Sequence, residues 1–276
     1  MSLYVGTSGW SYREWKPDFY PAEIKQKEWL NFYSTKLSAC EINATFYRLQ
    51  ANETFARWRD SVPDSFRYSI KAHRRLTHSR RIAPEGEGKD FLAAFFRSLE
   101  PLGDRLGVIL WQFPPYRKRD DDQLEALLAE IGGRRGAFEF RDDSWLNAEI
   151  RARLADAGHT MCVADTTGDP PTSLPPGPVA YIRLRHERYS EEQRDGWRKL
   201  LADEADKRDV YAFSKHEGVP AADPFAGVGF ATWLCNAGPR QGYSDGYEQR
   251  RSSDLHDQAD DAVGRRLASG HEDPQP

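Results

Sequence analysis

Charged side chains interrupt several short apolar segments of this 276-residue chain. Glu41 lies within ACEINATF, Lys71 within FRYSIKAH and Glu139 within GAFEFR. A charged group is costly to bury unless a partner compensates it, so such positions need an explanation. The pattern predicts either a polar ligand pocket or a structural layer of ion pairs at one end of a sheet. We favour the pocket, because the interruptions are numerous.

The candidate catalytic residues are acids and bases of these segments, namely Glu41, Glu139, Lys71 and Asp165. Glu41 and Glu139 are the predicted general acid and base, because pairing and burial can separate their pKa values. The candidate ligand-binding residues are Thr7, Ser8, Trp10, Asn43, Tyr47, Gln112, Arg141, Arg183, Arg185, Lys215 and His216. The cations of this set would bind an anion and stabilise developing charge, while the hydroxyls and amides would orient it.

No cofactor can be assigned from motifs. The chain lacks a P-loop, and no GxGxxG sequence follows the first apolar segment. Three histidines (His73, His186 and His216) lie near carboxylates, so a metal site is an alternative. The neighbouring lysines and arginines would repel a cation, and we therefore predict no metal ligand.

The elements that must position these residues follow a regular rhythm of apolar strand, turn and amphipathic helix. The expected strands cover 3–8, 39–46, 66–73, 105–114, 136–141, 159–166, 179–186 and 209–217. The expected helices cover 26–37, about 54–61, 89–102, 121–132, 146–158, 190–208 and 224–238. Eight alternating units predict an α/β fold of the TIM-type (β/α)₈ barrel class, with an open doubly wound sheet as the alternative.

Two further features complete the predicted architecture. The connection TGDPPTSLPPGP is too rich in Pro and Gly for a helix, so the helix between the sixth and seventh strands should be reduced or missing. Residues 1–238 should form the single barrel domain. Residues 239–276 are polar and of mixed charge, and are predicted to be a disordered C-terminal tail.

The barrel prediction places the candidate residues together, because functional groups of such barrels lie at the C-terminal ends of the strands. Alternation would place Glu41, Asn43 and Thr45 on one face of the second strand. Aromatic residues gather near the same strand ends, and they are Trp10, Tyr12, Trp15, Phe46, Tyr47, Trp111, Phe113 and Trp145. Together they could form a stacking rim for sugars or nucleobases, although each alone could be ordinary packing.

Composition restricts the partners. The net charge of −4 gives no general affinity for nucleic acid, although a local basic patch is compatible with it. No apolar run reaches the length of a membrane span, and the first strand begins too early for a signal peptide. The three separated cysteines suit free thiols in a reducing compartment. We predict a cytoplasmic protein without membrane contact, with the oligomeric state left open.

Several segments resemble the YecE-like family, domain of unknown function 72. They are YVGTSGWSYREW, EINATFYRL, FRYSIKAHRRLTH, LGVILWQFPP, FEFRDDSW and VADT, in consistent order over residues 4 to about 235. The resemblance implies a TIM-type barrel, whereas the activity of the family is not established. Arg185-His186 and Lys215-His216-Glu217 depart from the commoner family pattern and add positive charge or imidazole to one side of the mouth.

These observations predict an enzyme with hydrolase-type acid/base chemistry. The substrate would be small, anionic and ring-containing, with a phosphate, such as a nucleotide or possibly nucleic acid. The alternatives are a non-catalytic module that binds single-stranded nucleic acid or nucleotides, and a small-molecule isomerase or lyase.

Overall fold

The computed structural model describes residues 1–215 and 218–237. The predicted C-terminal tail and the candidate residue His216 lie outside the described residues. Among the residues described, no helix is both long enough and apolar enough to cross a membrane.

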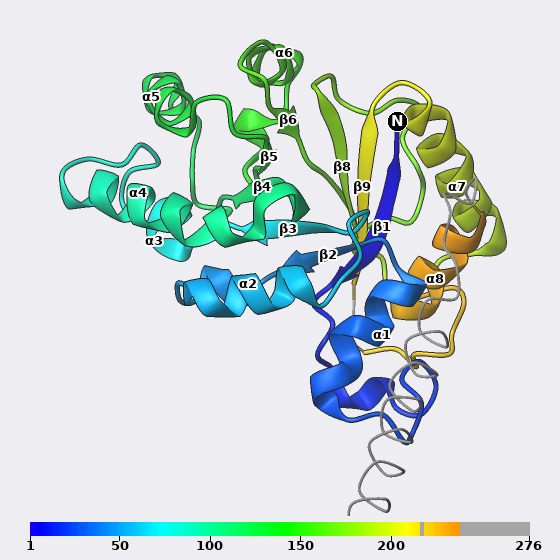
Figure 1. The fold of residues 1–276 in the computed structure, drawn as a ribbon. Helices are drawn as coiled ribbons and strands as arrows, with labels where there is room; N and C mark the ends of the chain where they lie inside the picture. The colour runs from blue at the N-terminus through cyan, green and yellow to red at the C-terminus, as the bar shows by residue number, and fades with distance from the viewer. Residues whose placement is uncertain (216–217, 238–276) are drawn as a thin grey trace, which may run out of the picture. The chain divides into compact units, whose positions relative to one another are not determined.

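Nine parallel strands form a nearly closed barrel, which confirms the predicted fold class (Figure 1). The strands are β1 (Leu3–Ser8), β2 (Ala39–Ile42), β3 (Arg67–Lys71), β4 (Leu106–Gln112), β5 (Gly136–Glu139), β6 (Thr160–Met161), β7 (Val163–Asp165), β8 (Val179–Leu184) and β9 (Asp209–Ser214). Their order is β6-β5-β4-β3-β2-β1-β9-β8-β7. The predicted sixth strand is divided at Cys162, so that β6 pairs with β5 and β7 pairs with β8.

Helices follow most strands, as in repeated β/α units (Figure 1). The α-helices are α1 (Trp29–Lys36), α2 (Asn52–Asp60), α3 (Arg74–Thr77), α4 (Glu87–Leu99), α5 (Asp121–Ile131), α6 (Ala148–Asp156), α7 (Glu191–Ala205) and α8 (Gly227–Ala237). Local sequence explains where several begin. Asp120 and Asn147 cap α5 and α6 through their side chains, and Ser190 with Gln193 forms a capping box on α7. Residues 166–178, all of them described, contain no helix, as predicted.

Short 3-10 helices occupy several connections, and one of them corrects the predicted second strand. They are η1 (Arg13–Trp15), η2 (Gln26–Glu28), η3 (Ala44–Phe46), η4 (Glu100–Arg105) and η5 (Asp143–Trp145). Because β2 ends at Ile42 and η3 follows, Asn43 and Thr45 do not continue its alternation. Thr45 instead donates a hydrogen bond to the carbonyl oxygen of Lys71 at 2.7 Å and is buried.

The interior of the barrel is filled by side chains at alternate strand positions. The buried cluster contains Ala39, Val108, Leu110, Ala137, Cys162, Val179, Tyr181, Tyr211 and Phe213, with Tyr4 packed against it. The rings of Tyr4 and Tyr211 stack with centroids 4.8 Å apart. Two residues further along several of these strands, toward their C-terminal ends, the inward positions become polar.

β1 and β2 approach each other closely at Gly6, which is opposite Ala39 in the register. A Cβ atom on Gly6 would lie 1.9 Å from the carbonyl oxygen of Ala39. Tyr33 of α1 covers this contact: its hydroxyl donates to that oxygen at 2.9 Å and accepts from the backbone N–H of Thr7 at 2.8 Å. Because Gly6 has no side chain, the two strands can come close enough for Tyr33 of α1 to bond to both.

Candidate functional site

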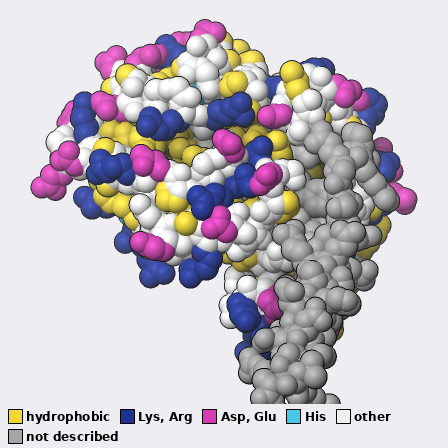
Figure 2. Space-filling model, in the orientation of Figure 1, with side chains coloured by type: hydrophobic (Ala, Val, Ile, Leu, Met, Phe, Trp, Pro, Cys, Tyr) yellow, Lys and Arg dark blue, Asp and Glu magenta, His cyan; other side chains and the backbone are white. Residues whose placement is uncertain are grey.

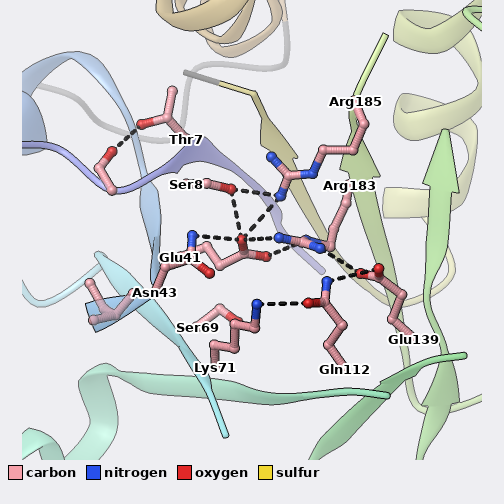
Figure 3. Close-up of polar contacts among 12 residues, drawn as sticks. Thr7, Ser8, Glu41, Asn43, Ser69, Lys71, Gln112, Glu139, Arg183 and Arg185 are labelled. Carbon is pink, nitrogen blue, oxygen red and sulfur yellow. Dashed lines mark hydrogen bonds and ion pairs between the residues drawn. The ribbon is translucent and has the colours of Figure 1, made fainter. Parts of the chain in front are cut away.

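A polar layer lies on top of the apolar interior, at the C-terminal ends of the strands (Figure 3). It is formed by Ser8 of β1, Glu41 of β2, Lys71 of β3, Gln112 of β4, Glu139 of β5 and Arg183 of β8. Parallel register places Ser8 opposite Glu41 and Gln112 opposite Glu139. Residues that are far apart in sequence thus meet at one end of the barrel, where sites of this fold occur.

Glu41 is the centre of the layer and has no exposed surface (Figure 3). Arg183 binds it through two nitrogens, with Nε 3.0 Å from Oε2 and Nη2 2.9 Å from Oε1. Arg185 Nη2 lies 3.1 Å from Oε1. Ser8 and Tyr181 donate to the same carboxylate at 2.7 and 2.8 Å. The carboxylate is therefore surrounded by donors.

A second chain of hydrogen bonds connects Glu139 to Lys71 (Figure 3). Arg183 Nη1 lies 2.6 Å from Oε2 of Glu139, so one guanidinium joins both buried glutamates. Gln112 donates from Nε2 to Oε1 of Glu139 at 2.8 Å and accepts from Lys71 Nζ at 2.7 Å. Arg141, half of whose side chain is exposed, donates to Glu139 from the solvent side at 3.0 Å.

The arginines hold both carboxylates in the ionised form. Burial alone would raise the pKa of Glu41, but Arg183, Arg185 and hydrogen bonds bring it well below its usual range. Burial opposes the same effect at Glu139, whose pKa is lowered chiefly by Arg183 and a hydrogen bond from Gln112. Four cations, Lys71, Arg141, Arg183 and Arg185, thus face two carboxylates.

The pKa of Lys71 is lowered too, but for a lysine this shift disfavours the charged form. Burial, reinforced by Arg183, lowers its pKa to about 8, although Glu41 and Glu139 act against the shift. Its ammonium lies 4.2 Å from the centroid of the Phe46 ring. A lysine with a pKa near neutrality can both donate and accept a proton under ordinary conditions.

Two buried polar atoms beside Glu41 lack a hydrogen-bond partner among the described residues. They are Oδ1 of Asn43, an acceptor, and Nε of Arg185, a donor. Asn43 makes a long contact of 3.4 Å to Glu41 through Nδ2, and Arg185 also donates to Ser8 Oγ at 2.6 Å. Unpaired groups of both kinds suit a ligand that offers a donor and an acceptor.

Several predicted site residues make contacts outside this layer. Thr7 is buried and binds the carbonyl oxygen of Gly9 and the hydroxyl of Tyr33. Trp10 packs edge-on against Trp58 at 5.0 Å. Asp165 accepts hydrogen bonds from the backbone of Thr167 and Gly168 and from Tyr189, which orders the loop after β7.

The remaining candidates lie at the rim. Tyr47 is 68 % exposed, with its ring edge-on to Phe46. Lys215 directly follows β9 and is partly buried. Its backbone N–H donates to the carbonyl oxygen of Leu184. No group of three or more histidine, cysteine or carboxylate side chains is arranged to hold a metal ion in residues 1–215 and 218–237.

Residues 4–227 match the family described as "Protein of unknown function DUF72". The chain belongs to the DUF72 family. The UPF0759 protein YunF of Bacillus subtilis is 25% identical over 260 residues, covering 80% of this chain and 91% of its own. The UPF0759 protein YecE of Escherichia coli is 26% identical over 112 residues, covering 41% of this chain and 38% of its own.

Crystal structures of other DUF72 proteins have the same fold. One from Thermotoga maritima has a TM-score of 0.69 at 24% identity and covers 85% of this chain and 98% of its own. One from Enterococcus faecalis has a TM-score of 0.65 at 16% identity, with 87% and 99% covered. These comparisons establish the family and the barrel, and they name no substrate.

Three residues of this DUF72 site were missed by sequence reasoning. Tyr181 donates a hydrogen bond to Glu41, and the hydroxyl of Ser69 lies 2.6 Å from that of Tyr181. Both precede a predicted site residue by two positions, so alternation along the strands could have identified them. His78 packs against Phe46 with centroids 4.9 Å apart. It lies in a loop, and no sequence pattern indicated it.

Proposed function

We propose that this protein is an enzyme that uses the polar layer to transfer protons to and from a small, phosphate-bearing, ring-containing substrate. The observation that carries the proposal is the combination of excess positive charge with a lysine whose pKa is lowered to about 8. Cations fixed before the ligand arrives stabilise negative charge without reorganising. A phosphate ester is the simplest substrate that uses both features.

The pKa values favour Lys71 as the proton donor, in place of the sequence-based assignment to Glu41 and Glu139. Both carboxylates are kept ionised by Arg183, which makes them weak bases and excludes them as acids near neutral pH. Their contacts suit a positioning role, because they hold Arg183 and Arg185 at the mouth. Asp165, engaged by its own loop, is assigned no part in the reaction.

Hydrolysis is the reaction we assign to this arrangement. The oxygen of a water molecule forms a bond to phosphorus, and the ester P–O bond breaks with its electrons on the leaving oxygen. The ammonium of Lys71 gives that oxygen a proton, and the water releases one to solvent, so Lys71 regains its proton from the medium. Arg141 and Arg185, the less buried arginines, would bind the phosphoryl oxygens.

Turnover of phenyl phosphate, followed by release of phosphate across a pH series, tests this function, because its leaving oxygen is basic enough to need the proton that Lys71 would give. A general acid must be protonated, so the rate should fall as the pH rises above about 8, which is the pKa of Lys71. Lys71→Met should lower the rate by about a hundredfold or more, within the usual range for general acid catalysis. Lys89→Met is the matched control, since Lys89 is exposed on α4 and pairs with Glu130.

Two other outcomes would contradict this proposal. Equal rates in Lys71→Met and the wild type would refute the assignment of Lys71. Tight binding of adenosine 5′-monophosphate without turnover of any phosphate ester would favour the non-catalytic nucleotide-binding alternative. The saturated hydrogen bonding of Glu41 is the observation that favours that alternative.

A further inference from the structure

A cavity of about 520 Å³ lies beside the polar layer, in the connection between β3 and α4. Its walls come from residues 74–88 and from Phe91 in the first turns of α4. Pockets of several hundred cubic ångströms are typical of small-molecule sites. The reaction proposed above uses none of these residues, so the cavity requires its own explanation.

The lining of the cavity is strongly basic. It contains Arg74, Arg75, Arg80 and Arg81, against the two carboxylates of Glu85 and Glu87. Glu85 pairs with Arg81 at 3.1 Å. Among the described residues, no carboxylate lies within ion-pairing distance of Arg74, Arg75 or Arg80. Figure 2 shows basic and acidic side chains interspersed over one face of the barrel. The cavity differs from such a mixed surface because it gathers around one hollow three exposed arginines without carboxylate partners in the described part of the chain.

The wall of the cavity is held in place by other parts of the chain. Arg117, in the loop after β4, donates to the carbonyl oxygens of Ser79 and Arg80. Gln123 of α5 accepts from the backbone N–H of Ile82 at 2.8 Å. Arg75 lies 4.4 Å above the ring of Phe91. These contacts fix the loop that carries the arginines.

His78 joins the cavity to the polar layer. It lines the cavity, and its ring also packs edge-on against Phe46, the ring that lies under the ammonium of Lys71. Burial lowers the pKa of His78, and the charges of Lys71 and Arg141 lower it further. Contacts therefore run from Lys71 over the rings of Phe46 and His78 to the wall of the cavity that the arginines also line.

We propose that this cavity is a second anion subsite of the same active site, and that the substrate carries two phosphate groups separated by a ring. One phosphate lies at the mouth, near Arg141 and Lys71. The second lies among Arg74, Arg75 and Arg80, and the ring between them lies over Phe46 and His78. We assign the substrate class to a small bisphosphate, because a volume of about 520 Å³ is in the range of small-molecule sites.

This inference rests on the proposed function for the position of the first phosphate. Calorimetric titrations at one ionic strength should compare adenosine 3′,5′-bisphosphate with adenosine 5′-monophosphate. The wild type should bind the bisphosphate roughly tenfold more tightly, since hydrogen bonds to charged groups are each worth about that factor. Arg80→Ala and Arg74→Ala should each reduce this preference several-fold while leaving the affinity for the monophosphate unchanged.

Two controls separate the possible failures. Arg151→Ala removes the same charge from an exposed position on α6 and should leave the preference intact. Arg141→Ala should weaken both ligands equally; if it weakens neither, the proposed function fails at the mouth. Equal affinities of the two ligands for the wild type would overturn the subsite alone. A ten-nucleotide single strand that binds more tightly than the bisphosphate would overturn the assignment to a small molecule.

Discussion

The carboxylate of Glu41 is buried among donors, and in the function proposed above it positions arginines and does not react. Its oxygens face Arg183, Arg185, Ser8 and Tyr181. Removing one partner of such a cluster leaves the others uncompensated in a medium that solvates charge poorly. Glu41 therefore fixes the positions of Arg183 and of Arg185, and Arg185 is one of the two arginines assigned to the phosphoryl oxygens.

Glu41→Gln should cost about 3–5 kcal/mol of the free energy of unfolding, because it leaves Arg183 and Arg185 without their shared counter-charge. Urea denaturation at pH 7 measures this quantity. Glu85→Gln is the control, since Glu85 is exposed and, among the described residues, Arg81 is its ion-pair partner; it should cost no more than about 1 kcal/mol. A loss of similar size in both variants would mean that the Glu41 cluster has no special role in stability.

The identity of the buried charges was predictable from sequence, but their partners were not. Glu41, Glu139 and Arg183 stand out because each interrupts an apolar strand. Arg183 lies 142 positions after Glu41, and only the closed barrel brings them together. The lowered pKa values of the glutamates depend on this long-range pairing, so the sequence could not distinguish a reactive carboxylate from a positioning one.

At the scale of the elements, the junction of β1, β2 and α1 depends on backbone approaching backbone. Gly6 faces Ala39 without an intervening side chain, and the hydroxyl of Tyr33 bonds to both strands. The junction determines the positions of Ser8 and Glu41, because each lies two residues beyond the close contact of Gly6 with Ala39 in the same register. The positions of these two side chains in the polar layer are thus set by the pairing of β1 with β2.

Gly6→Ala should destabilise the protein by about 3 kcal/mol or more, because the added methyl group would overlap the carbonyl oxygen of Ala39. Thermal and urea unfolding provide the measurement. Gly133→Ala is a matched control, since a Cβ atom there would have no neighbour within 4 Å. A fully stable Gly6→Ala variant would contradict the close approach of the two strands.

The elements were more predictable than their ends. Alternating apolar strands and amphipathic helices identified the barrel, and the Pro- and Gly-rich connection identified the missing helix before β8. The second strand was predicted to reach Phe46, yet it ends at Ile42, because η3 turns the chain and Thr45 binds the backbone of β3. A turn stabilised by a tertiary hydrogen bond has no local signature in the sequence.

At the scale of the whole molecule, buried ionisable groups link stability to pH. Glu41 and Glu139 have lowered pKa values in the folded state, so the unfolded chain binds more protons once the pH falls toward their ordinary value of 4.5. Burial also lowers the pKa of His159 below its ordinary value of 6.5. The unfolded state again binds the extra proton, so both kinds of group make stability fall on acidification.

The free energy of unfolding should therefore decrease as the pH falls below about 6.5, and decrease more steeply below about 4.5. His159→Leu should make the decrease between about pH 6.5 and pH 4.5 less steep. The substitution removes a buried base whose ring nitrogens have no hydrogen-bond partner among the described residues. His73 and His78, with pKa values lowered in the same direction, should retain part of the decrease. Denaturation at a series of pH values tests this, and an unchanged slope in His159→Leu would contradict it.

The side chains that fill the barrel affect how small molecules can reach the polar layer. Tyr4, Tyr211 and their neighbours fill the interior below the polar layer, so in the part of the chain that the structure describes, packed side chains separate that layer from the opposite end of the barrel. In the function proposed above, substrate and product would therefore both pass the C-terminal ends of the strands. A single bulky adduct at that rim would then halt entry and release together.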